Sequence, residues 1–435
     1  MTTAGADGTL VLGAGMSGLG AGRSLRAPVY EATDRPGGVC CSTYVTAEGV
    51  PRDPLHEDVS DCFRFEPAGG HWLFVPDDAS LDTLRPYARF RSYVRRAAVY
   101  FASTGQTVPF PLQEHLHHLP EPLRRQILSE ILAPSDPHAP PPHTFRAWLL
   151  AYFGPTLCGL FFFPFNERYT AGLLDQIAPQ DAYKSPIRRE RILAGASAPT
   201  AATGYNATFH YPEGGLDHLV RALAAGLDIH YHHRVRQVDP ARRTIHFEDG
   251  TERPYRRLVS SLPLARMLAI AGLPADPDPA TAVLVVNIAA ERGPACPHEH
   301  WLYVPDARSG LHRVGLYSEV DPDFVPTRRR HDVVSLYVER AYPSGGRPDT
   351  AATERACHDI LAELQEWGFI GTPILVRPTF TDPAYTWSRP GSTWVDQARR
   401  TLRDQAIEPI GRYGTWRFQG MLESYLQGRA TLGRP

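Results

Sequence analysis

The chain has 435 residues, 43% of them hydrophobic and 21% charged, as expected for a globular protein of two or three domains. A formal net charge of −2 gives no electrostatic reason to expect a nucleic acid or an anionic membrane as partner. Six scattered cysteines without a CxxC spacing argue against a disulfide framework, a zinc ribbon and a redox dithiol, and we expect no bound metal.

The first predicted element is a buried strand over residues 10–12 that leads into a glycine-rich turn, Gly13-Ala14-Gly15-Met16-Ser17-Gly18. Three glycines in this spacing allow a tight turn, close approach of the backbone to a pyrophosphate, and close packing of helix on strand. The following helix presents free N–H groups that favour anions. A second strand over residues 29–30 ends at Glu31, whose carboxylate can accept hydrogen bonds from ribose hydroxyls. The pattern predicts a dinucleotide site.

The next segment, Glu31-Ala32-Thr33-Asp34-Arg35-Pro36-Gly37-Gly38, favours a flavin over a nicotinamide cofactor. A nicotinamide enzyme needs only the glycine turn and the acidic residue. The added arginine and glycine pair resemble the E-A-x-x-R-x-G-G stretch of glutathione-reductase-type FAD enzymes, such as amine oxidases and protoporphyrinogen oxidases. The resemblance implies FAD, with Arg35 and the glycine pair along its adenosine and diphosphate.

The rest of the chain alternates between helical and strand-like stretches. Helices are expected over 123–132, 145–153 and 215–227, and strands over 228–235, 258–261, 282–288, 314–317 and 333–338. We predict an α/β fold: a Rossmann-like FAD-binding domain (residues 1–78, 206–262 and 391–435), an inserted helical substrate-side lobe (79–205) and a second, mostly antiparallel β-sheet substrate domain (263–390).

No segment points to a membrane or to export. The richest apolar stretch, residues 157–165, is too short to span a bilayer. Residues 1–8 lack the basic and apolar regions of a signal peptide. We therefore expect a cytoplasmic protein; its oligomeric state stays open, a homodimer included.

Five later segments resemble, in the same order, motifs of the UDP-galactopyranose mutases and their relatives. They are the glycine–glycine–histidine loop (Phe63–His71), the F-x-x-P-Y-N-x-K segment (Phe161–Arg168), the Y-P-x-G-G helix start (Tyr211–Gly215), the strand pair that presents a diphosphate-binding arginine (Trp301–Asp306 with Leu311–Val314) and the closing G-R-x-G-x-W motif (Gly411–Trp416).

This resemblance implies an FAD-dependent isomerase, a nucleotide-sugar mutase that interconverts pyranose and furanose forms. In that family the flavin is reduced, and its N5 forms an adduct with the sugar while the nucleoside diphosphate leaves and returns, without net redox change. Fixed arginines near the departing diphosphate stabilise its growing charge.

The resemblance also implies roles for individual residues. The catalytic residues would be His71 beside the flavin, Arg313 and Arg188 or Arg189 at the diphosphate, and Tyr385 at the substrate. FAD would be bound by Gly13, Gly15, Met16, Ser17, Gly18, Glu31, Ala32, Arg35, Gly37, Gly38, Gly70, His71, Val235, Arg412 and Met421. The substrate would be bound by Phe162, Phe165, Asn166, Tyr169, Arg313, Tyr317, Tyr385 and Tyr413.

The chain departs from the family pattern on the substrate side. Arg168-Tyr169-Thr170 replaces the segment that usually ends in tryptophan, Tyr385-Thr386 replaces Tyr-Pro, and residues 420–424 lack the Asn-x-Asp-His stretch of animal and fungal relatives. We therefore expect a different nucleotide sugar, used in specialised metabolism. The alternatives are a flavin oxidoreductase of the amine-oxidase or desaturase type and a non-catalytic flavoprotein.

Overall fold

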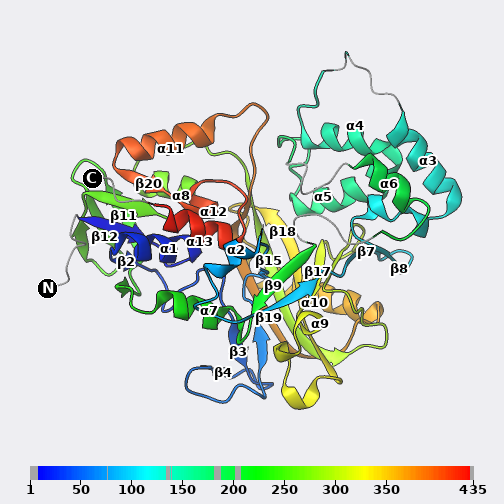
Figure 1. Ribbon diagram of the computed structural model, residues 1–435, viewed down its shortest axis with the longest axis horizontal. Coiled ribbons are helices and arrows are strands. Elements are labelled where there is room, and N and C mark those ends of the chain that lie inside the picture. The colour runs from blue at the N-terminus through cyan, green and yellow to red at the C-terminus, as the bar shows by residue number, and fades with distance from the viewer. Residues whose placement is uncertain are drawn as a thin grey trace.

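The computed structural model describes residues 8–75, 77–133, 138, 140–180, 188–200 and 207–431. The N-terminal motif lies on a parallel sheet, at the left of Figure 1. In spatial order its strands are β10 (Ile229–His230), β2 (Val29–Tyr30), β1 (Thr9–Leu12), β14 (Arg257–Ser260) and β20 (Ile407–Pro409). All neighbouring pairs are parallel, which confirms the α/β fold with a parallel sheet of the FAD-binding type.

One predicted strand of this region is interrupted. Instead of a strand over 228–235, the chain forms β10, then a turn in which His232 has a φ of 60°, then β11. The left-handed backbone at this residue cannot continue a strand. A small antiparallel sheet follows, made of β11 (Val235–Asp239), β12 (Thr244–Phe247) and β13 (Glu252–Pro254).

Helices cover the parallel sheet: α1 (Met16–Leu25), α7 (Gly215–Ala224), α8 (Leu264–Ile270), α11 (Trp394–Asp404), α12 (Gly411–Gly414) and α13 (Met421–Arg429). The first and last of them pack directly on each other, because glycines face the contact. A Cβ on Gly428 would lie 2.0 Å from the carbonyl oxygen of Ser17, and one on Gly20 would lie 2.4 Å from that of Tyr425. Such a close helix pair tolerates only glycine at these positions.

A second, mixed sheet lies beside the first. Its strands, in spatial order, are β19 (Ile370–Thr386), β15 (Ala280–Arg292), β18 (Val333–Pro343), β17 (Arg313–Leu316), β16 (Trp301–Tyr303), β7 (Ala97–Phe101) and β8 (Gln106–Pro109). The pairs are antiparallel except β16 with β7. Both faces of β15 are buried: Val283 and Val285 pack toward the FAD-domain side, and Leu284 and Val286 pack under α10 (Thr350–Glu366).

The helical lobe is shorter than the predicted 79–205 region. Strands β7 and β8 belong to the mixed sheet, because the run Ala97–Phe101 is buried throughout and pairs with β16. The lobe proper contains α3 (Glu121–Leu132), α4 (Phe145–Leu157), α5 (Phe163–Tyr169) and α6 (Arg189–Gly195), at the upper right of Figure 1. The domain boundary expected between residues 205 and 206 lies outside the described residues.

A π-helical turn, η3 (Cys158–Phe162), joins α4 to α5. The resulting run Phe145–Tyr169 is long and apolar enough to cross a membrane by length and composition alone. This corrects the sequence expectation, which considered only residues 157–165. Gly154, at φ 74° and ψ 164°, breaks the helical geometry, and Phe153 and Phe161 pack into the core of the lobe. A core helix passes the same test of length and composition.

The remaining elements connect these parts. They are β3 (Thr43–Val45), β4 (Pro51–Arg52), β5 (Phe63–Phe65), α2 (Asp78–Asp82), β6 (Phe90–Val94), β9 (Thr208–Pro212), α9 (Tyr317–Val320), η1 (Leu112–Glu114), η2 (Leu116–His118), η4 (Pro322–Phe324) and η5 (Thr327–Arg329).

Candidate active site

A cavity of about 790 Å³ lies where the three parts of the fold meet. One end is lined by the glycine turn after β1, and the other by α5 of the lobe and by strands β16–β18 of the mixed sheet. Residues far apart in sequence therefore line one continuous cavity, and ligand sites commonly lie at such junctions between domains.

The glycine turn is arranged for a dinucleotide. Glu31 accepts a hydrogen bond from the backbone N–H of Ala14 through Oε2, at 2.7 Å, so its carboxylate is fixed beside the turn. Helix α1 begins after Gly15, which caps it without any side-chain hydrogen bond. Gly15, Met16 and Ser17 line the cavity, so the N-terminus of α1 lies at its wall. Uncapped N–H groups and the helix dipole suit a pyrophosphate.

The second glycine pair completes the turn. Gly37 has a φ of 107°, and its N–H donates to the carbonyl of Ala14 at 2.8 Å. A Cβ at Gly37 would lie 2.6 Å from the carbonyl oxygen of Cys40, so a side chain there would distort the turn formed by residues 37–40. The residues present thus fit the FAD expected from the sequence.

The structure brings most of the predicted cofactor residues to this wall. The residues that line it are Gly13, Gly15, Met16, Ser17, Glu31, Ala32, Gly37, Gly38, Gly70, His71, Val235, Arg412 and Met421. Gly18 and Arg35 do not line it. A Cβ on Gly18 would lie 1.8 Å from the carbonyl oxygen of Gly13, so this glycine serves the helix–turn packing. Arg35 is half-buried on the loop beyond the wall.

His71 faces the middle of the cavity with a defined tautomer. Its Nδ1 lies 2.7 Å from the carbonyl oxygen of Gly69, so Nδ1 carries the proton and donates it. Burial lowers the pKa of His71 to about 4, which keeps the ring neutral and leaves Nε2 as an acceptor. The preceding Gly70 is needed for space, because a Cβ there would lie 2.6 Å from the hydroxyl of Tyr337.

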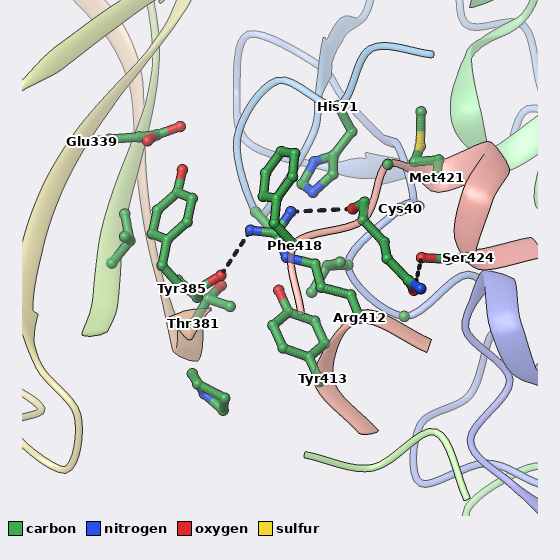
Figure 2. Close-up of a pocket in the computed structure, with 18 of the residues that line it drawn as sticks. Cys40, His71, Glu339, Thr381, Tyr385, Arg412, Tyr413, Phe418, Met421 and Ser424 are labelled. Atoms are coloured by element: carbon green, nitrogen blue, oxygen red, sulfur yellow. Dashed lines mark hydrogen bonds between the residues drawn. The ribbon is translucent and has the colours of Figure 1, made fainter. Parts of the chain in front are cut away.

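Arg412 crosses the cavity between the closing motif and β19 (Figure 2). Its two terminal nitrogens donate to the carbonyl oxygens of Gln419 at 3.4 Å and Ala384 at 3.3 Å. The guanidinium lies 4.6 Å from the ring centre of Phe418 and 5.4 Å from that of Tyr385. These contacts hold a positive charge against aromatic faces at the centre of the site.

Arg313 is paired inside the cavity. Its Nη2 donates to Oε1 of Glu339, which lies directly opposite it on β18, and to the hydroxyl oxygen of Tyr385 at 3.1 Å. Burial alone would raise the pKa of Glu339, but the Arg313 guanidinium and the neighbouring His312 together outweigh it and lower that pKa to about 2. Burial, with help from the Glu339 carboxylate, raises the pKa of Tyr385 to about 12. Tyr385 is thus protonated, with its hydroxyl directed toward Glu339 in Figure 2.

The far end of the cavity is aromatic. Phe162, Phe165 and Tyr169 of the η3–α5 segment line it, with ring centres of Phe165 and Tyr303 5.3 Å apart. Nδ2 of Asn166 donates to the carbonyl of Phe162 at 2.7 Å, which fixes the amide and leaves Oδ1 and the second N–H for a ligand. Tyr413 also lines the cavity. Flat apolar walls with one fixed polar group suit a stacked ring.

Three residues predicted for the substrate side also lie elsewhere. Arg188 and Arg189 are exposed and do not line the cavity, and Arg189 donates to the carbonyl of Ile131 at 2.9 Å. Tyr317 is fully buried behind the wall, because β17 ends at Leu316 and a helical turn carries the ring into the core. Its hydroxyl lies 3.0 Å from the carbonyl oxygen of Glu66. The structure does not bring these residues to the ligand space.

The charged or titratable residues of the wall that sequence reasoning missed include Arg95, His312 and Glu339. Glu339 directly follows the apolar run of β18, so a carboxylate at the end of a buried stretch was a usable signal. Arg95 sits at the bend between β6 and β7, buried with Nη2 3.2 Å from the carbonyl oxygen of Phe110, and no local pattern marks it. Among the described residues, no group of three or more His, Cys, Asp or Glu side chains is placed to hold a metal ion.

Comparison with known proteins agrees with this geometry. A sequence-family model described as "Flavin containing amine oxidoreductase" matches residues 16–284. The crystal structure of a reduced UDP-galactopyranose mutase is similar with a TM-score of 0.83 and 22% identity, over 97% of this chain and 94% of that one. A putative protoporphyrinogen oxidase from Exiguobacterium sp. 255-15 gives a TM-score of 0.67 at 14% identity, over 98% of both chains. A CLA-producing fatty acid isomerase from P. acnes gives 0.60 at 15% identity, also over 98% of both. At these identities the likenesses establish the fold.

Proposed function

Because this chain belongs to the flavin containing amine oxidoreductase family, we propose that it is an FAD-dependent isomerase that interconverts the pyranose and furanose forms of a nucleotide sugar. The proposal rests mainly on one observation: a single cavity runs from the dinucleotide-binding turn to an aromatic end that also contains Arg313 and Tyr385. We call this far end of the cavity the second chamber. Likeness in fold to UDP-galactopyranose mutase over nearly the whole chain supports it.

The cofactor would lie along the glycine turn, with its diphosphate at the first N–H groups of α1 and its ribose beside Glu31. Reduced FAD, when bound there, supplies the nucleophile for exchange at the anomeric carbon of the sugar. Neutral His71 offers Nε2 as an acceptor to whatever N–H or O–H faces it, and Arg412 supplies a fixed positive charge.

The second chamber would bind the nucleotide. A leaving diphosphate gains negative charge, and Arg313 is already oriented by Glu339 to meet it without reorganisation. The buried Arg95 provides a second cation in the same cavity, in the role that the family resemblance implied for Arg188 or Arg189. The hydroxyl oxygen of Tyr385 accepts a hydrogen bond from Arg313, so the hydroxyl keeps its own proton. That proton is available for a sugar oxygen.

A flavin oxidoreductase of the amine-oxidase or desaturase type is the second candidate. The family description and the aromatic lining favour it, as does Glu339, which offsets the charge that Arg313 would present to a diphosphate.

One experiment separates the two. The FAD-loaded protein is incubated with a panel of nucleotide sugars, with and without dithionite, and the products are analysed for furanose forms. We expect interconversion only when the flavin is reduced. Hydrogen peroxide formed from an amine without any reductant, and no sugar isomerisation, would reject the mutase and favour the oxidase.

A further inference from the structure

His312 is a cavity residue that the proposed chemistry leaves unused. It precedes Arg313, lines the cavity, and has only 1% of its surface exposed. Nδ1 has no hydrogen-bond partner among the described residues, and Nε2 faces only the carboxylate of Glu339, at 3.4 Å. A buried polar group without a partner destabilises a fold, since it has lost its water and gained nothing in exchange. Its position in the wall therefore points to a ligand that supplies the missing hydrogen bond.

The surroundings of His312 determine which nitrogen carries the proton. Nε2 lies 3.4 Å from Oε2 of Glu339, a carboxylate that stays ionised because of Arg313. An anion at this distance favours the tautomer with the proton on Nε2. Burial lowers the pKa of His312, so the ring is neutral near pH 7. Nδ1 is then a pure acceptor, buried on a residue that lines the cavity.

The rings of α5 border the same imidazole. Its centre lies 5.5 Å from that of Tyr169 and 6.2 Å from that of Phe165, at the aromatic end of the chamber. A phosphate oxygen cannot pair with Nδ1, because it has no proton to donate at neutral pH. The partner must be a hydroxyl or an N–H group near a stacked ring.

We propose that Nδ1 of His312 accepts a hydrogen bond from a donor on the nucleoside part of the substrate, and that His312 thereby determines which nucleotide the cavity selects. The inference rests on the proposed function, because it takes the substrate to be a nucleotide sugar. The donor is a ribose hydroxyl or an N–H of the base, and the two sources are separable by analogues. Sites that hydrogen-bond one substrate group reject analogues lacking it far more strongly than apolar pockets do.

The test measures binding of nucleoside diphosphates to the FAD-loaded protein by isothermal titration calorimetry. The probes are the diphosphates of uridine, cytidine, adenosine and guanosine, then the 2′-deoxy, 3′-deoxy and base-N-methylated forms of the tightest binder. For that nucleotide we expect His312→Leu to weaken binding roughly 10- to 100-fold. The same variant should bind one analogue as well as wild type does, and that analogue identifies the donor.

Two conservative variants locate the contact on the ring. The side-chain oxygen of His312→Asn can occupy the place of Nδ1, whereas His312→Gln places its terminal group near Nε2. We expect the Asn variant to retain most of the affinity and the Gln variant to lose it. His298→Leu is the control, because His298 is exposed and lies outside the cavity wall.

The Tm of the ligand-free His312→Leu variant separates a binding role of His312 from a purely structural one. A structural role predicts a lower Tm, whereas a binding role predicts a higher one. Removing a buried imidazole whose Nδ1 has no partner should raise the Tm of the ligand-free protein by a few degrees, even as nucleotide binding weakens. Equal weakening for every analogue, or a lower Tm without selective loss, would overturn the role of His312 and leave the proposed function standing. Failure of the wild type to bind any of the nucleoside diphosphates would instead reject the proposed function itself.

Discussion

At the scale of single residues, the pair Arg313–Glu339 controls the chemistry of the second chamber. The carboxylate orients the guanidinium and offsets its charge, so the chamber presents directed hydrogen bonds rather than a free cation. The same carboxylate faces His312, so one buried anion organises two neighbours. Substitutions in this group should therefore separate activity from folding.

Arg313→Ala should leave FAD bound and reduce kcat/KM by at least a hundredfold, because a fixed cation is lost where charge develops. It also leaves Glu339 buried without its partner, which lowers stability by about 3 kcal/mol. In the double variant Arg313→Ala/Glu339→Gln, stability should recover while activity does not. Flavin absorbance, urea denaturation and turnover measure the three effects, with Arg308→Ala on the surface as control. Recovery of activity in the double variant would contradict the role given to Arg313.

Glu66 provides a pH test. Burial raises the pKa of its carboxyl to about 8, although Tyr211 and Ser42 donate to it. The folded state thus holds this proton up to pH 8, whereas the unfolded chain releases it near pH 4.5. The contribution of Glu66 to stability is present below pH 4.5 and declines as the pH rises toward 8.

Glu66→Gln, which mimics the protonated acid, should therefore gain stability relative to wild type as the pH increases from 5 to 8. Thermal melts of both proteins across this range measure the difference. A constant difference in Tm would show that Glu66 does not keep its proton in the folded protein.

At the scale of elements, sequence patterns predicted what depends on neighbours along the chain. The turn from Gly13 to Gly18 and strand β2 follow from local spacing, and the structure confirms both strands that flank the turn. The charged wall of the second chamber depends on how strands distant in sequence pair. Arg313 meets Glu339 only because the pairing of β17 with β18 places these two residues opposite each other. Arg95 likewise enters the cavity through the bend between two strands, a position that no spacing rule reveals.

The contact between α1 and α13 gives the element-scale prediction. Gly428→Ala places a methyl group 2.0 Å from the carbonyl oxygen of Ser17, so the two helices must separate. We expect a loss of more than about 2 kcal/mol in the free energy of unfolding, together with weaker FAD binding, because α1 carries the turn. Gly159→Ala is the matched control, since nothing lies within 4 Å of its added methyl group. Urea denaturation and the flavin content of the purified protein check both; equal effects of the two substitutions would refute the packing argument.

At the scale of the whole molecule, the cavity makes ligand binding a property of all three parts of the fold. FAD at a hundred times its Kd should stabilise the protein by about 2.7 kcal/mol. In hydrogen-exchange measurements, FAD should protect α1 and α13, and a nucleotide added afterwards should protect α5 and β17. Protection of α1 alone by the nucleotide would place the second ligand outside the proposed chamber.

The order of strands in the parallel sheet also affects when its parts can assemble during synthesis. The chain supplies β1 and α1 among its first elements, but β20 and α13 among its last. At roughly 5–20 residues per second, tens of seconds of synthesis separate the glycine turn from the helix that packs behind it. The ribosome therefore releases the turn long before α13 exists to support it, and stable binding of the cofactor expected there can begin only after α13 has been made.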